Sequence, residues 1–551
     1  MKNNVKNYIA NMPIKAKAEN NLMLCNHANE ELSIKNGGLA SDNAVASTVK
    51  KVWWPRLSFA ALLIIFTVFA YLPSLDKVFI NDQMSYFLEL NGETSLASGF
   101  RLLDYGANRQ YNKGDEVLYR PLLFVVLALE NSLFHRDFRL WNVANLVFHL
   151  LVAYLLFEVL WRIKRTLLAC GFALLFALLM SNFELVTWNH LGGYILGYGL
   201  LLLALWSARE MVQDKEYSCI RWFWIYGIAM TCAMLFHEIA VIASFGVIAY
   251  FGYCRRSKLS KKCVKLIAAT CAPIFIYAVL YSFHFLQCNR FFDLAHGFVS
   301  SPIKYLAAIL LLILYWLQHI FFPVPSQFVV LAMHRSSWTK LSGTMIPEII
   351  VASVLWAGTL FFLRQGLELK YLKKNLPFAA LICFLIISYA GMNIVGRFNN
   401  AMEVSYYDYF PALFGMVLLY SLINFSRLRQ TSKIAALACL FLLTLNNGWH
   451  VRNISNNIQE IYSPMARSLK WIEQTVRPKL SNPDFSFDIK GIPKELDMKG
   501  KVFWGYPDQG KYFAMPLLYV LYGKYYNSIT PSHILVVRDI RTGKMDLLTT
   551  K

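Results

Sequence analysis

The stretch LSFAALLIIFTVFAYLPSL (Leu57–Leu75) is a long apolar run without a single charged residue. A helix needs about 20 such residues to cross the hydrocarbon core of a bilayer. The polar segment before the run, residues 1–52, has no apolar region of the kind that a cleavable signal peptide requires. The run therefore predicts an uncleaved membrane-spanning helix preceded by a disordered tail.

Further apolar runs of roughly spanning length follow the first one. They lie at 138–160, 167–180, 191–206, 222–236, 239–254, 265–286, 344–363, 376–391, 408–425 and 434–447. The composition agrees, because 57% of the residues are hydrophobic and only 16% are charged, well below the quarter that is usual in soluble domains. We expect an all-α polytopic membrane protein with about eleven crossings.

The basic residues set the orientation of these crossings. They concentrate in the connectors 161–166, 254–265, 364–374 and 427–433, which share one side of the membrane if the N-terminus is cytoplasmic. The formal net charge of +21 is thus explained by positive-inside topology, and we do not expect a nucleic-acid partner. The C-terminus is then expected outside.

The run at 303–321 does not fit this alternation, because a full crossing there would place one basic loop on the wrong side. It ends in FFPVPSQF (321–328), whose two prolines cannot continue a helix. We interpret it as a re-entrant or interfacial helix.

Three regions follow from this topology: a cytoplasmic tail (1–52), a transmembrane domain (53–449) with a first outer loop at 76–137, and an outer segment at 450–551. The last region has a helix-like stretch at 463–476 and strand-like stretches at 501–506 and 533–540. It predicts a small extracytoplasmic α/β domain.

The patch GGYILGYG (192–199) places Gly193 and Gly197 four residues apart on one helix. This spacing is typical of close helix packing in membranes and is a weaker match to a phosphate-binding loop. Ten cysteines are scattered, mostly in or beside apolar runs, and form no zinc-like spacing. We predict no metal and no other cofactor.

Ionisable residues near the outer ends of spans are costly to desolvate and mark functional sites. Asp82 follows the first run, and YRPLL (119–123) brings Tyr119 and Arg120 to a proline that can start a helix. Arginine holds phosphate through a fork of N–H donors.

Three later stretches add further candidates. These are Glu184 and His190 in SNFELVTWNHLGG (181–193), His237 and Glu238 between two apolar runs, and Arg397 with Tyr407 near a late outer turn. Each residue also has a simpler interpretation: Asp82 as a solvated acid, Arg120 snorkelling to lipid headgroups, His190 as an interface donor, and the His237–Glu238 pair as a hairpin closure. Tyrosines in these turns are common in interfacial belts.

The order of these motifs is more specific than any one of them. Between residues 57 and 447 the chain has Asp82, YRPLL, LWNVANLVFHLLVAYLL (140–156) with Asn145 and His149, the turn with Glu184, FHEIA (236–240) and YYDYFPALFG (406–415). This order resembles the GT-C superfamily of integral-membrane glycosyltransferases, nearest to the membrane part of the transmembrane-and-TPR O-mannosyltransferases and their bacterial relatives. The chain departs from that pattern where Tyr406 stands in place of an arginine, where His237 stands in place of a lysine, and where no TPR array follows.

The resemblance implies transfer of a sugar from a polyprenyl-phosphate donor to a hydroxyl of a glycan, lipid or protein acceptor at the outer face. It implies inversion, with Asp82 as general base and Arg120 at the leaving phosphate, helped by Arg397 or His237. The other candidates would bind substrate; they are Tyr119, Glu184, His190, Glu238 and Tyr407.

Other functions remain open at this point. A lipid-linked oligosaccharide ligase or polymerase would share the basic loops but needs an arginine and histidine cluster in one large late loop, and a transporter would show internal repeats. A non-catalytic GT-C scaffold is a further alternative. The Lys- and Asn-rich composition favours a bacterial inner membrane with a periplasmic outer face; the endoplasmic reticulum is the alternative, and one NIS sequon (453–455) does not decide between them.

Overall fold

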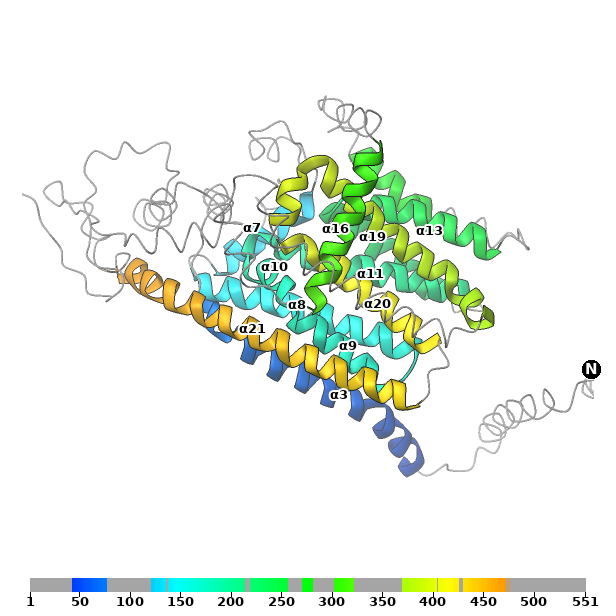
Figure 1. Ribbon diagram of the computed structural model, residues 1–551, viewed down its shortest axis with the longest axis horizontal. Helices are drawn as coiled ribbons and strands as arrows, with labels where there is room; N and C mark the ends of the chain where they lie inside the picture. The colour runs from blue at the N-terminus through cyan, green and yellow to red at the C-terminus, as the bar shows by residue number, and fades with distance from the viewer. Residues whose placement is uncertain are drawn as a thin grey trace, which may run out of the picture. The chain divides into compact units, whose positions relative to one another are not determined.

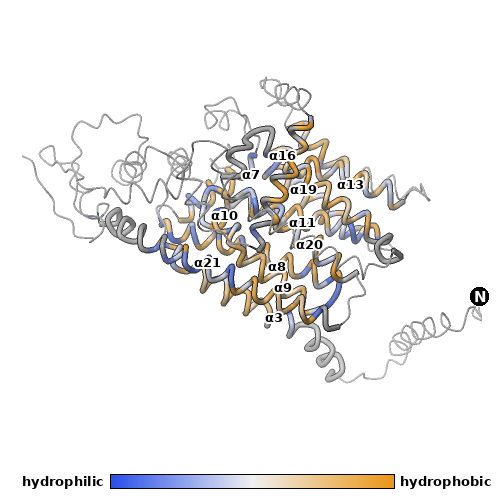
Figure 2. Tube along the Cα trace, viewed as in Figure 1, coloured by the Kyte–Doolittle hydropathy of each residue, from blue (hydrophilic) through white to orange (hydrophobic). Residues whose placement is uncertain are grey.

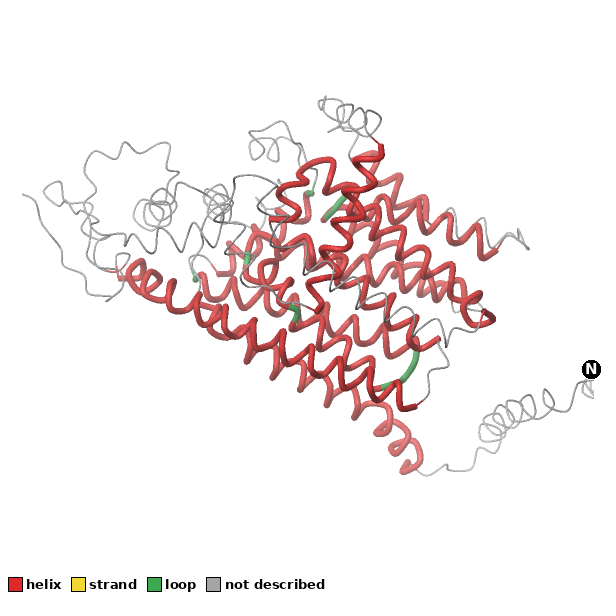
Figure 3. The backbone as a smooth tube through the Cα atoms, in the orientation of Figure 1, coloured by secondary structure: helices red, strands yellow, loops and turns green. Residues whose placement is uncertain are grey.

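The computed structural model describes residues 42–76, 120–134, 137–213, 219–255, 270–280, 302–321, 369–403, 405–425, 430–471 and 474. These residues form helices and a few short turns, and no strand occurs among them (Figure 3). The chain divides into residues 1–62 and residues 63–551, and the first unit contributes the start of the first helix described. The predicted all-α fold is confirmed for the described part of the chain.

The predicted apolar runs fall largely within helices, whose arrangement Figure 1 shows; the run at 344–363 lies outside the described residues. The helices are α3 (Asp42–Tyr71), η1 (Leu72–Asp76), α7 (Pro121–Phe134), α8 (Phe138–Ile163), α9 (Leu167–Leu178), η2 (Met180–Asn182), α10 (Phe183–Thr187), η3 (Asn189–Leu191), α11 (Gly192–Gln213), α12 (Cys219–Phe236), α13 (Ile239–Arg255), α16 (Pro302–Phe321), α19 (Leu369–Glu403), η4 (Ser405–Asp408), α20 (Tyr409–Phe425) and α21 (Gln430–Trp471). A further helical stretch covers residues 270–280.

Five of the described helices are long and apolar enough to cross a membrane, or six if the bent pair Leu167–Leu178 and Met180–Thr187 is one span. Apolar residues make up much of these helices (Figure 2). The protein is therefore a multi-pass integral membrane protein, while the full number of about eleven crossings and the re-entrant role of α16 stay predictions.

Helix α11 packs against α12, α8 and α7, and its glycines make this packing possible. A Cβ atom on Gly193 would lie 2.6 Å from Leu123 Cδ1, and one on Gly197 would lie 2.6 Å from Phe236 Cβ. Both distances are too short for any side chain, so α7 and α12 approach α11 only because these positions are glycine. The packing role predicted for the glycine pair is confirmed.

Two elements differ from the sequence-based description. Helix α7 lies inside the predicted first outer loop, 76–137, and packs against α11 and α12. Helix α21 runs unbroken for 42 residues through the predicted domain boundary at 449–450. The predicted α/β domain is described only as far as Trp471, and its strands lie outside the described residues.

Candidate active site

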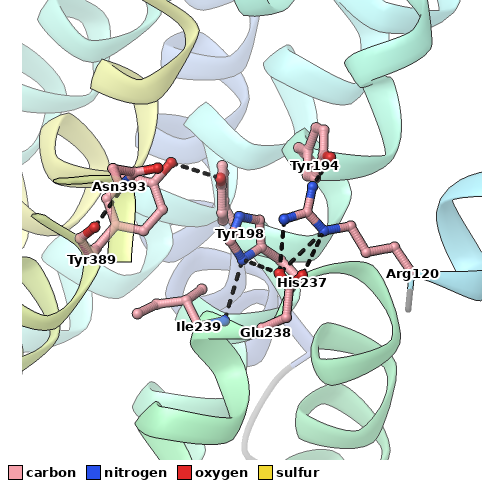
Figure 4. Close-up of polar contacts among 8 residues, drawn as sticks. All are labelled: Arg120, Tyr194, Tyr198, His237, Glu238, Ile239, Tyr389 and Asn393. Carbon is pink, nitrogen blue, oxygen red and sulfur yellow. Dashed lines mark hydrogen bonds and ion pairs between the residues drawn. The ribbon is translucent and has the colours of Figure 1, made fainter. Parts of the chain in front are cut away.

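Helices α12 and α13 are joined by only two residues, His237 and Glu238. The His237 amide donates to the Ala233 carbonyl at 2.9 Å, and the Ile239 amide donates to His237 Nδ1 at 3.2 Å (Figure 4). The ring therefore caps the start of α13, and Glu238 projects from the tip. This is the tight hairpin that the sequence predicts for the pair.

Glu238 is the partner of Arg120, which lies directly before the start of α7. Arg120 Nε donates to both carboxylate oxygens of Glu238 at 3.1 Å, and Nη2 donates to Oε2 at 2.9 Å (Figure 4). Nη1 contacts the hydroxyl of Tyr194, and the guanidinium carbon lies 5.0 Å from the centroid of that ring. The Arg120 and Glu238 side chains are 15% and 21% exposed, so the ion pair is mostly buried but still accessible to solvent.

The charges of this cluster are fixed by its neighbours. Burial lowers the pKa of Arg120, but the adjacent Glu238 carboxylate keeps it well above its usual value. Burial raises the pKa of Glu238, but Arg120 and His237 outweigh this and lower it. Burial, together with the Arg120 cation, lowers the pKa of His237 to about 3. Near neutral pH the cluster holds a cation, a carboxylate and a neutral imidazole.

Three tyrosines surround this charged pair. Tyr194 and Tyr198 lie one turn apart on α11, and the hydroxyls of Tyr198 and Tyr389 are 3.0 Å apart (Figure 4). The His237 ring lies 5.5 Å from Tyr194, 5.5 Å from Tyr198 and 5.9 Å from Tyr389, measured between ring centroids. Tyr407 lies in η4, which packs against α19, the helix that carries Tyr389. We call Arg120, His237, Glu238 and these three tyrosines the arginine cluster.

The tyrosines of α11 and α19 were missed by the sequence analysis. Tyr194 and Tyr198 are part of GGYILGYG, which was interpreted through its glycines alone. Their spacing of four residues does place both on one helix face next to the expected outer end, and this was the available signal. Nothing in the sequence around Tyr389 distinguishes it from an ordinary tyrosine of an apolar span.

Glu184 and His190 lie together in the turn that follows α9. The chain bends by 47° between α9 and the segment 180–187, and both side chains are buried. Asn145 of α8 holds the turn by donating from Nδ2 to the Trp188 carbonyl at 3.0 Å. Helix α10 packs against η4, so the turn lies next to the segment that carries Tyr407. A direct role of Glu184 and His190 in sugar binding stays a prediction.

His149 belongs to the same ordered set of motifs, and its contacts indicate a structural role. It is fully buried, with Nδ1 at 3.0 Å from the Tyr409 hydroxyl and Nε2 at 3.0 Å from the Ala177 carbonyl. The ring therefore joins α8 to the end of α9 and to the start of α20. Its contribution to the site is to hold these three helices in register.

Some of the remaining candidates are not among the residues that the structure describes. Asp82 and Tyr119 lie outside the described residues, and Arg397 lies in α19 with its side chain outside the described part. Tyr407 is described and lies in η4, which packs against α19. The described residues contain no group of three or more His, Cys, Asp or Glu side chains that would hold a metal ion.

Comparison with known proteins gives only distant likenesses. No protein-family model and no curated protein matches the chain. Two solved structures do. ArnT from Cupriavidus metallidurans, bound to undecaprenyl phosphate, is 14% identical with a TM-score of 0.38, over 85% of this chain and 77% of ArnT. The Archaeoglobus fulgidus oligosaccharyltransferase, tethered to an acceptor peptide, is 12% identical with a TM-score of 0.43, over 86% of this chain and 64% of that protein. With TM-scores below 0.5 and identities below 25%, neither structure assigns an activity or a site residue to this chain.

Proposed function

We propose that this protein is a GT-C type membrane glycosyltransferase that moves a sugar from a polyprenyl-phosphate donor to an acceptor hydroxyl. Two lines support the proposal. The motif order from Asp82 to YYDYFPALFG resembles that superfamily. The structure also brings Arg120 and Glu238, two residues of that order separated by 118 positions, into direct contact at the end of the bundle.

The observation that carries the proposal is the geometry of Arg120. A guanidinium has five N–H donors, and Glu238 with Tyr194 engages its Nε, one Nη2 donor and one Nη1 donor. Within the described residues this leaves two N–H groups on the 15% exposed guanidinium for a further acceptor. Glu238 holds the fork in one orientation, so a phosphate oxygen can be bound without reorganising the cation.

The reaction then needs one displacement. Asp82 would take the proton of the acceptor hydroxyl as its oxygen forms a bond with the anomeric carbon. The bond from that carbon to the phosphate oxygen breaks, and its electron pair goes to the departing polyprenyl phosphate, whose charge Arg120 stabilises. Attack from the opposite side inverts the anomeric centre. The buried turn with Glu184 and His190 would shape the sugar site, while Tyr119, Tyr407 and Arg397 would contribute contacts to the donor.

The donor is membrane-embedded, so the site needs to lie only at the level of the outer leaflet. We place that face in the periplasm of a bacterial inner membrane, with the N-terminus cytoplasmic, on the grounds of composition and basic loops. The acceptor is a glycan, lipid or protein hydroxyl.

The test uses a deletion strain and mass spectrometry of its glycans. The missing sugar identifies donor and acceptor class, and the strain is then complemented with the wild-type protein, Asp82→Asn or Arg120→Gln. Asp82→Asn should reach the membrane at wild-type levels, and Arg120→Gln is compared at a matched amount of membrane protein because it is expected to be less stable; both should fail to restore the sugar. Arg139→Gln is the matched control, since that side chain is 63% exposed and pairs loosely with Asp76 at 3.7 Å; it should restore the sugar fully.

Other results would point elsewhere. A deletion strain with unchanged monosaccharides but shortened or unattached chains would favour the oligosaccharide ligase or polymerase. Full restoration by Asp82→Asn would remove the enzymatic proposal and leave a scaffold or a transporter.

A further inference from the structure

A second buried pair lies beside the arginine cluster and was not predicted. His319 in the last turn of α16 contacts Asp408, the last residue of η4, through Nδ1 and Oδ2. The two side chains are only 8% and 2% exposed, and they are 89 positions apart in the chain. Because two ionisable groups are removed from water here, their contact has to offset the cost of desolvating both.

The pair joins α16 to the segment that faces the arginine cluster. Trp316 lies one turn before His319, and its ring centroid is 5.8 Å from that of Tyr389. On the other side of Asp408, Phe410 stacks on Tyr389 at 4.3 Å and lies 5.3 Å from Tyr198. The contact between His319 and Asp408 therefore joins α16 to η4 next to two ring contacts with Tyr389, one from Trp316 and one from Phe410.

Tyr407 is the immediate neighbour of Asp408 in η4. That turn packs against α19, the helix that carries Tyr389. A short turn can place such a side chain reproducibly only when its backbone is held. Residues on the opposite side of α16, such as Ile303 and Leu306, are exposed and apolar, so they supply no polar tie of their own.

We propose that His319 and Asp408 are positioning residues of the candidate site, which hold η4, and with it Tyr407, against α19, the helix that carries Tyr389 of the arginine cluster. A role of the Tyr407 hydroxyl in binding the donor phosphate rests on the function proposed above. The pair itself acts through Tyr407 and does not touch the reacting atoms. Buried polar pairs have this role elsewhere, where they specify one arrangement of packed elements.

The experiment combines a binding measurement with a readout that needs no ligand. Fluorotyrosine is placed at position 407 of the full-length protein in nanodiscs, and its fluorine resonance is recorded. Affinity for undecaprenyl phosphate is measured in parallel by native mass spectrometry. The variants are His319→Leu, which removes the contact, and His319→Asn, whose amide nitrogen can take the place of Nδ1 as donor. Asp408→Asn gives a milder loss if the leucine variant folds poorly.

Tyr420→Phe is the matched control. It removes a buried hydroxyl from α20, the helix that follows η4, but at the other end, where that hydroxyl contacts Thr166 and the Lys164 carbonyl. It tests whether any loss of a polar contact on this helix disturbs Tyr407.

We expect His319→Leu to move or broaden the fluorine resonance and to weaken polyprenyl-phosphate binding about ten-fold, as expected for one lost charge-assisted hydrogen bond. His319→Asn should restore both, and Tyr420→Phe should change neither. In a double variant with Tyr407→Phe, the loss at His319 should add nothing further, because both act on the same contact.

An unchanged resonance in His319→Leu and Asp408→Asn would overturn the positioning role, as would a loss of turnover with binding and resonance intact, which would place the pair in the chemistry. If the resonance moves but the wild-type protein binds no polyprenyl phosphate, the positioning role stands and the proposed function fails.

Discussion

Replacing each half of the Arg120–Glu238 pair separates its structural role from its proposed chemical one. Both Arg120→Gln and Glu238→Gln leave one charge without its partner, in a setting where three contacts of 2.9–3.1 Å are made. Fully buried pairs lose about 3–5 kcal/mol when one partner is removed. Since these side chains are 15% and 21% exposed, we expect each variant to lower the free energy of unfolding by about 2–3 kcal/mol.

The two variants should differ in donor binding. Arg120→Gln removes the cation and should weaken undecaprenyl-phosphate binding by about 10- to 100-fold, the worth of one or two charge-assisted hydrogen bonds. Glu238→Gln keeps the cation and removes a like charge from beside the phosphate. At about 7 Å this repulsion is about 0.6–2.4 kcal/mol for effective dielectric constants between about 80 and 20, so binding should tighten by about 3- to 60-fold.

The assay measures dissociation constants by native mass spectrometry and unfolding midpoints by tryptophan fluorescence, in the same detergent. Equal destabilisation with opposite changes in affinity is the expected pattern. If both variants lose affinity in parallel with stability, the ion pair only stabilises the fold, and Arg120 is not the phosphate ligand.

Two further predictions concern packing and pH. Gly192→Ala should destabilise the protein by about 1–3 kcal/mol, because the added Cβ would lie 2.1 Å from Asn145 Oδ1, whereas Gly227→Ala, with nothing within 4 Å, should not; thermal unfolding of the two variants checks this. Burial raises the pKa of Glu238, but the nearby Arg120 cation lowers it by more, so the pKa of Glu238 lies below its ordinary value of 4.5 in the folded protein. The pair's stabilisation should therefore be complete above about pH 4.5 and lost as the pH falls through the folded value, and Glu238→Gln should lack this part of the acid transition in an unfolding series from pH 7 to pH 3.

Helix positions were well predicted because apolar runs and their flanking charges carry the signal locally. The run at 138–160 became α8 at Phe138–Ile163, with Asp137 as its N-cap, accepting from the amides of Arg139 and Leu140 at 3.0 and 3.2 Å. The start of α7 was indicated by Pro121, but the helix was not predicted as a packed element of the bundle because its 14 residues are too short to span a bilayer. They also directly follow a segment rich in acids.

The site was predicted residue by residue but not as an arrangement. Arg120 and Glu238 were each selected because they flank an apolar run, and no local pattern pairs residues 118 positions apart. The same reason hides the Tyr198–Tyr389 contact and the His319–Asp408 pair, which depend on how α16 and α19 pack. Asp408 is part of the stretch YYDYFP, from which Tyr407 was selected as a candidate and the Asp408 carboxylate was not.

The unbroken length of α21 has a mechanical consequence. Its apolar window ends at Asn456, and the helix continues to Trp471. At 1.5 Å per residue these last turns add about 22 Å of helix beyond the apolar window. Each residue inserted or deleted between Asn456 and Trp471 would move the C-terminal end of the helix by about 1.5 Å along its axis and rotate it by about 100°.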